Sequence, residues 1–381
     1  MTKNIVYISG TRADYGLMRS VLRALDQSPD FDLEVVATGM HLMPEFGNSV
    51  SEILADGFRH HKIPVIFEND TRESMSLFIG KFVTSLTEKI MKIQPDLILL
   101  LGDRGEMLAG AIVGTYLGIP IAHIHGGEIT STVDEPTRHA ITKLAHIHLP
   151  ATEKSAQRII RMGEDPATVH VVGAPGLEAI LKGEFTPIET LLKKYHLDSS
   201  IPFLLVIQHP VSDEIRKSAI QMKTTLDVIS GYACQTLIIY PNADAGGRQM
   251  IPVINKYCKS PNFQAHKNLP HADYLGLMRI TSVLVGNSSS GIVEAPSFHV
   301  PVVNIGSRQQ GRERAVNVLN AGYDRTEITN AINKALHDRR FLSRVRRCEN
   351  PYNHGSASEN ILQIFRQIDL SAIRTQKHNF Y

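Results

Sequence analysis

A group of side chains able to move protons and hold anions follows two apolar runs in the middle of the chain. The apolar runs are Leu97–Leu101 and Ile119–Ile124. The polar residues that follow them are Asp103, Arg104, His125, Glu128, Asp134, Arg138 and His139. Carboxylates and imidazoles serve as general acids and bases, and arginines bind phosphate or carboxylate groups. The spacing predicts an acid/base site with an anion-binding component.

The elements that must position these residues form a βαβ unit. Both apolar runs have the length and composition of buried strands, and an Ala/Gly-rich helical segment, Met107–Leu117, lies between them. Its small residues would let the helix lie close against a sheet. Parallel strands carry their working residues at the carboxyl ends, so we expect both polar clusters at one sheet edge.

A simpler interpretation is that the acids only cap helices. Asp103, Glu128 and Asp134 each precede or begin a helical segment, where a carboxylate is a common N-cap. For a single acid, capping and function are about equally well supported. Capping does not explain why acids, histidines and arginines converge on one edge, so the set favours a functional site.

A metal site is a second alternative for the same region. His123 and His125 alternate on one strand face and Glu128 follows them. Core histidines of parallel strands have the same pattern, and no third ligand follows at a zinc spacing. We therefore expect no metal.

Composition limits the class of protein. A chain of 381 residues is too long for one ordinary core and indicates two α/β domains. A net charge of +2 gives no support for a nucleic-acid or membrane-surface partner. No run has membrane-spanning length, and the first strand follows the start without a signal peptide. The three cysteines are scattered, which favours reduced thiols and the cytoplasm.

The N-terminal strand, Ile5–Ser9, leads through Gly10–Gly16 into a helix from Leu17 to about Leu25. Such a turn offers free N–H groups and a helix dipole to an anion. It is neither a dinucleotide fingerprint nor a P-loop, because the later glycines and the Gly-Lys-Ser/Thr are missing. Arg12 could pair with Asp14, but we favour a phosphate contact.

The second half repeats the alternation of strands and helices. The expected strands are Phe203–Ile207, Thr236–Tyr240, Thr281–Val285 and Val302–Ile305, and each ends in polar or glycine residues. We expect an N-terminal domain at 1–175 with the catalytic acids and a second domain at 176–355 with its own ligand edge. We expect a strand at Val169–Val172 near this boundary. The last segment, 356–381, contains an amphipathic helix predicted to pack back on the N-terminal domain, followed by a frayed tail from Asp369.

The run Gly286–Gly291 is the most informative part of the second half. Its serines and glycines, at a strand-to-helix turn, can offer hydroxyl and N–H groups to a diphosphate, whereas an ordinary N-cap needs one serine. Glu294, predicted one turn into the next helix, could receive two ribose hydroxyls or only favour the dipole. Arg308 could neutralise phosphate. His209, at a strand end, could contact phosphate or a leaving group.

Taken together, these motifs resemble the UDP-N-acetylglucosamine 2-epimerase family, and most of all its hydrolysing branch. The resemblance covers the whole chain. Its motifs are Gly10–Gly16, Leu101–Arg104, His125–Glu128, Val133–His148, Gln208–Pro210, Tyr240–Gly246, Gly286–Pro296 and Ile305–Glu313. It implies a GT-B-like α/β fold with two Rossmann-like domains and the active site in the cleft between them.

The resemblance also implies roles for individual residues. The residues implied in UDP binding are Arg12, Arg104, His209, Asn242, Ser288, Ser289, Glu294 and Arg308, with the backbone near Leu269 reading the uracil. Asp103 and Asp134 match catalytic acids, and Arg138 matches an active-site arginine. His125 stands where many relatives carry an acid, so the C2 base could be His125 or Glu128.

The implied reaction is elimination followed by hydration, with UDP and a free sugar inverted at C2 as products and no cofactor. The sugar could be N-acetylglucosamine or N,N'-diacetylbacillosamine, and the sequence leans weakly to the second. The product would enter sialic or legionaminic acid biosynthesis. The alternatives are a GT-B glycosyltransferase, a non-hydrolysing epimerase and a non-catalytic sugar-nucleotide-binding regulator. A homo-oligomer, a dimer or a tetramer, is expected from the family alone.

Overall fold

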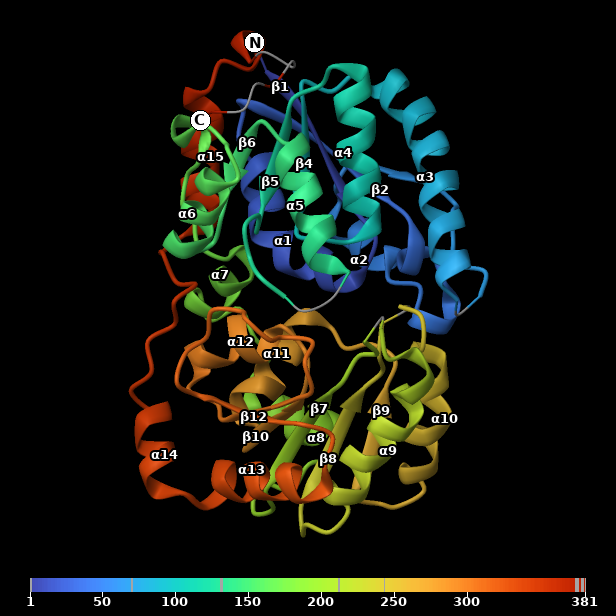
Figure 1. Ribbon diagram of the computed structural model, residues 1–381, viewed down its shortest axis with the longest axis vertical. Helices are drawn as coiled ribbons and strands as arrows, with labels where there is room; N and C mark the ends of the chain where they lie inside the picture. Colours follow the sequence, from blue (N-terminus) through green and yellow to red (C-terminus); the bar gives the residue numbers. More distant parts are fainter. Residues whose placement is uncertain are drawn as a thin grey trace. The chain divides into compact units, whose positions relative to one another are not determined.

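The chain folds into two compact α/β units, seen in a computed structural model (Figure 1). The structure describes residues 2–69, 71–130, 133–211, 213–242, 244–373, 377 and 380, without the side chain of residue 371. The first unit consists of Met1–Ile129, Val133–Glu178 and Tyr352–Tyr381, and the second is built on Ala179–Pro351. The two predicted α/β domains are therefore confirmed.

Within the described residues, the first unit contains a six-stranded parallel sheet of order β3-β2-β1-β4-β5-β6. The strands are β1 (Lys3–Ser9), β2 (Phe31–Ala37), β3 (His60–Lys62), β4 (Leu97–Leu101), β5 (Ile121–Ile124) and β6 (Ile147–Leu149). The strand order reverses between β1 and β4, and ligands of open α/β sheets bind at such a switch point.

The helices of the first unit cover both sheet faces. They are α1 (Arg12–Asp26), α2 (Val50–Asp56), α3 (Arg72–Ile93), α4 (Gly105–Leu117), α5 (Asp134–Leu144), α6 (Glu153–Arg161) and α15 (Ala357–Gln367). Successive strand residues point to opposite faces, so Tyr7 joins the cluster around α1 while Ile8 faces α4. A Cβ on Gly110 of α4 would lie 2.8 Å from Leu100 Cδ2. The small residues of α4 therefore allow the predicted close approach to the sheet.

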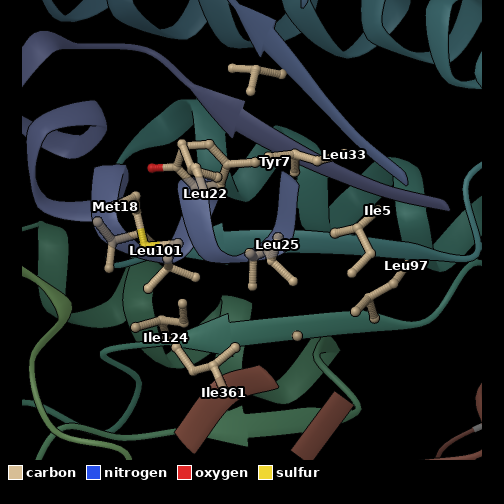
Figure 2. Packing of buried hydrophobic residues seen from close by; sticks show 14 of the residues in the cluster. Ile5, Tyr7, Met18, Leu22, Leu25, Leu33, Leu97, Leu101, Ile124 and Ile361 are labelled. Carbon is tan, nitrogen blue, oxygen red and sulfur yellow. The ribbon is translucent and has the colours of Figure 1, made fainter. Parts of the chain in front are cut away.

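The last helix completes the core of the first unit. Ile361 and Phe365 of α15 are buried in one apolar cluster with residues of β1, β4 and α1. Figure 2 shows Ile361 in this cluster. The Lys3 ammonium donates to the carbonyl oxygens of Phe365 and Ile368, at 2.6 and 2.7 Å. These contacts fasten the C-terminal segment to the first strand of the chain.

The second unit repeats this topology, with a six-stranded parallel sheet of order β12-β11-β10-β7-β8-β9 in the described chain. The strands are β7 (Phe203–Ile207), β8 (Gln235–Ile239), β9 (Phe263–His266), β10 (Val283–Gly286), β11 (Val302–Ile305) and β12 (Val318–Ala321). The helices are α7 (Glu178–Leu181), which begins at the unit boundary, α8 (Ile188–Lys194), α9 (Ser218–Ile229), α10 (Gly247–Tyr257), α11 (His271–Ile280), α12 (Ser290–Val293), α13 (Arg325–His337) and α14 (Arg339–Val345). Its switch point lies between β7 and β10.

One local expectation is wrong. Val169–Val172 forms no strand but a single bridge from Val169 to His148, because the run turns at Gly173 immediately afterwards. Much of the tail predicted to fray, at 374–376, 378–379 and 381, lies outside the described residues; within the described part, Lys377 Nζ donates to the Lys143 carbonyl at 2.9 Å.

No helix in the described part of the chain combines the length and the apolar character needed to cross a bilayer.

Candidate active site

The turn after β1 is organised around an internal anion. Asp14, which is buried, accepts hydrogen bonds from the N–H groups of Gly10 and Thr11, at 3.1 and 2.7 Å, and from the Ser9 hydroxyl. These N–H groups are therefore not free for a ligand, which corrects the expectation from the turn. Arg12 forms an ion pair with Glu52 on α2. Burial raises the pKa of the Asp14 carboxyl, against hydrogen bonds that lower it.

Asp103 and Arg138 form an ion pair at the end of β4. The Arg138 side chain is buried, and its Nη1 also donates to the Glu128 carbonyl at 2.9 Å. The N-cap of α4 is Arg104, not Asp103, and no side chain caps that helix end. Capping therefore does not explain Asp103, whose carboxylate instead joins α5 to the strand edge.

His125 and Glu128 form a second pair in the turn after β5. The His125 backbone is left-handed, with φ at +60°, a conformation that non-glycine residues adopt mainly at turns and functional sites. Its Nδ1 lies 2.5 Å from Oε1 of the buried Glu128. A carboxylate at Nδ1 fixes the ring orientation and leaves Nε2 as the nitrogen that can accept a proton.

His123 is a core histidine, as its strand pattern allowed, and it also supports the backbone next to Asp103. Its Nε2 lies 2.7 Å from the Gly102 carbonyl oxygen, next to Asp103, and its Nδ1 lies 3.1 Å from Thr142 Oγ1 on α5. Burial lowers the pKa of His123 to about 3, so the ring stays neutral. Both ring nitrogens are used, so His123 is a core histidine. No cluster of three metal-ligating side chains occurs among the described residues.

Asp134 and His139 lie on α5 with Arg138. Asp134 is the first residue of the helix, four positions before Arg138, and is half-buried. Residues four apart lie on one helix face, so Asp134 and Arg138 face the same side. His139 Nε2 is 3.8 Å from Glu135 Oε1, and burial lowers the pKa of the His139 ring.

In the second unit, His209 lies at the carboxyl end of β7. Its Nδ1 accepts the Asn242 N–H at 3.2 Å, so the neutral ring carries its proton on Nε2. The Asn242 side chain donates to Asp244 at 2.5 Å, and its buried Oδ1 has no hydrogen-bond partner among the described residues. An orphaned buried acceptor beside a histidine donor fits a polar ligand.

Ser288 and Ser289 follow β10 as predicted, but the helix after them is shorter than expected. Helix α12 is one turn long, so Glu294 follows it and does not lie inside it. The Ser288 hydroxyl lies 2.8 Å from that of Ser290, and Ser289 is the N-cap of α12 without a side-chain cap. This turn therefore offers a ligand serine hydroxyls more than the dipole of a helix.

The other predicted nucleotide-binding residues divide between the two units. Arg308 Nη1 donates to the Asn287 carbonyl at 3.2 Å, and Leu269 is buried just before α11. Arg104 belongs to the first unit, as Arg12 does, and its Nε lies 3.2 Å from Oε2 of the buried Glu106. The candidate acid/base residues thus lie within the first unit and most of the candidate UDP contacts within the second.

The sequence model of the family described as UDP-N-acetylglucosamine 2-epimerase matches residues 23–366. The chain is 41% identical over 382 residues to a hydrolysing UDP-N,N'-diacetylbacillosamine 2-epimerase of Legionella pneumophila, with 100% of both chains covered. It is 34% identical over 338 residues to a UDP-N-acetylglucosamine 2-epimerase of Neisseria meningitidis serogroup B, covering 87% of each.

Among solved structures, a Neisseria meningitidis UDP-GlcNAc 2-epimerase bound to UDP-GlcNAc superposes with a TM-score of 0.81 at 18% identity, over 96% of this chain and 100% of that one. This similarity confirms the GT-B-like fold. The chain belongs to the UDP-N-acetylglucosamine 2-epimerase family.

Proposed function

We propose that the protein is a hydrolysing UDP-sugar 2-epimerase. The observation that carries this proposal is the pairing of His125 with Glu128 beside Asp103 and Arg138, an acid/base set at one sheet edge. The full-length similarity to a hydrolysing epimerase supports the same reaction. A regulator that only binds sugar nucleotides would not need these pairs.

The reaction begins with removal of the proton on sugar C2. His125 accepts it through Nε2, because the Glu128 carboxylate occupies Nδ1. The electron pair of the C2–H bond forms a C1=C2 double bond as the C1–O bond breaks and UDP leaves with that bond's electrons. The C2 proton is weakly acidic, so stabilising the charge that develops on the diphosphate supplies much of the driving force.

Hydration then completes the inversion. Water adds its oxygen to C1, and a proton returns to C2 from the opposite face, giving the free manno-type sugar. Two groups on opposite faces are needed for the two proton transfers. Asp103 and Asp134 are the candidates for the second group. Arg138 pairs with Asp103 and holds its carboxylate in place.

The second unit supplies most of the UDP site. The residues proposed to contact UDP there are His209, Asn242, Ser288, Ser289, Glu294, Arg308 and the backbone near Leu269. The first unit adds Arg12 and Arg104. Arginines and hydroxyls neutralise and hydrogen-bond the diphosphate, and the Glu294 carboxylate accepts from ribose hydroxyls.

The Legionella relative favours UDP-N,N'-diacetylbacillosamine as substrate and the meningococcal relative UDP-N-acetylglucosamine, and the higher identity and coverage of the first lead us to propose the former. The product would serve legionaminic or sialic acid biosynthesis. We also propose that the enzyme works as a homo-oligomer, without a cofactor, in the cytoplasm, where its free cysteines remain reduced.

Proton NMR of the products tests the proposal. The purified protein is incubated with each UDP-sugar and no acceptor. We expect UDP and a free sugar inverted at C2, formed faster from the preferred substrate. An epimerised UDP-sugar without free UDP would indicate a non-hydrolysing epimerase. Dependence on an added acceptor would indicate a glycosyltransferase.

A further inference from the structure

Asn287, the residue after β10, holds the main chain of His209 at the end of β7. The His209 N–H donates to Asn287 Oδ1 at 2.7 Å, and Asn287 Nδ2 donates to the His209 carbonyl at 2.9 Å. The chemistry of the partners fixes the amide orientation, because only the amide oxygen can accept from an N–H. The Asn287 side chain thus ties together the two strands that flank the switch point of the second unit.

Burial protects these two hydrogen bonds, the Asn287 clamp, from replacement by water. Asn287 exposes only 1% of its surface, so water cannot readily replace its two hydrogen bonds. The Asn287 N–H also donates to the Ile207 carbonyl at 3.0 Å, which fixes the main chain from which the side chain projects. The side chain therefore has one consistent geometry toward His209.

The imidazole of His209 is held by a separate contact, from the Asn242 N–H to Nδ1 at 3.2 Å. This contact sets the tautomer, and the Asn287 clamp sets the position of the backbone from which the ring projects. Together they determine where the Nε2–H of His209 points. A donor aimed in this way can stabilise a leaving diphosphate without reorganising during the reaction.

We propose that Asn287 is a positioning residue for the departure of UDP, acting through His209. This role rests on the proposed function, in which His209 contacts the diphosphate. The Asn287 carbonyl also accepts from Arg308 Nη1 at 3.2 Å and from Gln309 Nε2 at 3.0 Å. Those bonds use the main chain, so truncation of the side chain removes only the contacts with His209.

The test compares Asn287→Ala with Asn304→Ala. Asn304 is a matched control, a buried asparagine on the neighbouring strand β11 whose Nδ2 donates to Asn320 Oδ1 at 3.0 Å. The affinity for UDP, by calorimetry, and the steady-state kinetic constants are measured for both variants. Loss of two buried hydrogen bonds predicts that Asn287→Ala weakens UDP binding and lowers kcat/KM by about 10- to 100-fold. Asn304→Ala should stay within about threefold of wild type, with a similar loss of thermal stability.

A double-mutant cycle identifies the path of the effect. In a His209→Ala background, Asn287→Ala should weaken UDP binding by less than about threefold, because the ring it positions is gone. An undiminished effect there, or UDP binding by Asn287→Ala at the level of Asn304→Ala, would overturn the role. If Asn287→Ala does not fold, the isosteric Asn287→Asp, which keeps the acceptor and loses the donor, takes its place.

UDP binding separates this inference from the proposed function. If the wild type binds UDP but turns over neither UDP-sugar, the proposed reaction fails, and the role of Asn287 is decided by the binding data. If the wild type turns over a UDP-sugar and Asn287→Ala matches Asn304→Ala in UDP binding and kcat/KM, the role of Asn287 is overturned and the proposed reaction stands.

Discussion

The contact between His125 and Glu128 allows a separate role to be proposed for each residue of the pair. Both residues were candidates for the C2 base, but Glu128 is buried with Oε1 2.5 Å from the imidazole Nδ1. This arrangement favours His125 as the base and Glu128 as the group that orients it. A histidine is suited to accept a proton near neutral pH.

Glu128→Gln should lower kcat by about 10- to 100-fold with little change in KM, because the ring loses its orienting charge while the substrate contacts remain. Steady-state kinetics measure this. Glu34→Gln is the matched control, since Glu34 Oε2 pairs with His61 Nε2 at the same distance, 2.5 Å, on the β2–β3 margin of the same unit. An equal effect of both substitutions on kcat would contradict the assignment.

Asp103→Asn should reduce turnover by more than about 100-fold, because an amide can neither give nor take the proton. Asp96→Asn, at the opposite end of the same strand, is the control, since Asp96 accepts the Asn4 N–H at 2.7 Å, far from the candidate site. Thermal melts check that Asp103→Asn still folds. Turnover near wild type would remove Asp103 from the mechanism.

At this scale, residue types and their order predicted which residues gather at the candidate site but not the partner of each residue. The sequence brought together Asp103, His125, Glu128 and Arg138. It could not show that Asp14 fills the turn after β1, because an internal carboxylate and an external anion satisfy the same N–H groups. Nor could it show the contact between His123 and Thr142, because these residues lie 19 positions apart in the sequence.

At the scale of elements, the turn after β5 must pass close to helix α6. Gly127 has φ at +74°, and a Cβ there would overlap the main-chain oxygen of Ser155, which cannot move aside easily. The same turn carries His125 and Glu128. The backbone that carries the proposed base is thus fixed by a glycine packed against a helix.

Gly127→Ala should lower the unfolding free energy by about 3 kcal/mol, the sum of the left-handed strain and the overlap. Gly57→Ala is matched for the strain alone, since Gly57 has φ at +81° and a Cβ added there would have no atom within 4 Å. That substitution should cost about 1 kcal/mol. Urea unfolding measures both. Equal losses would show that the packing against Ser155 is unimportant.

The elements that sequence could predict are the central ones. The expected bounds of β4, β7 and β11 agree with the structure because these strands are continuous apolar runs. The edge strands β3 and β9 were not predicted from the sequence, because short segments such as His60–Lys62 carry no apolar run. Their pairing comes from the neighbouring strand and not from their own composition.

At the scale of the whole molecule, two buried histidines of the first unit couple its stability to pH. Burial lowers the pKa of His41 to about 4 and that of His123 to about 3, whereas both titrate near the ordinary value of 6.5 when unfolded. Between these values the unfolded chain binds more protons, so stability falls as the pH falls below about 6.5.

Each histidine should therefore lower the unfolding free energy by about 2 kcal/mol between neutral pH and pH 5. His41 makes its contacts through Ser9 and Ser49, at 2.8 and 2.9 Å. We expect His41→Gln to be less stable at pH 7 but to show a shallower loss between pH 7 and pH 5, measured by urea unfolding. An unchanged slope would show that His41 does not titrate in this range.

The first unit is closed by a segment from the far end of the chain. Phe365 of α15 exposes 1% of its surface and meets Phe31 edge to face, with ring centroids 6.4 Å apart. Phe365→Ala should lower the unfolding free energy by about 3–5 kcal/mol. Phe380 is 55% exposed, so Phe380→Ala should change the unfolding free energy by less than about 0.5 kcal/mol. Comparable effects of the two substitutions would contradict the packing.

We propose above all that His125 removes the C2 proton as UDP leaves and that another group returns a proton on the opposite face. The most direct measurement is proton NMR of the reaction in D2O for the wild type and for His125→Gln. We expect free sugar carrying deuterium at an inverted C2 from the wild type, and at least about a 100-fold slower release of UDP from His125→Gln. Free sugar that keeps its C2 proton and configuration would contradict it.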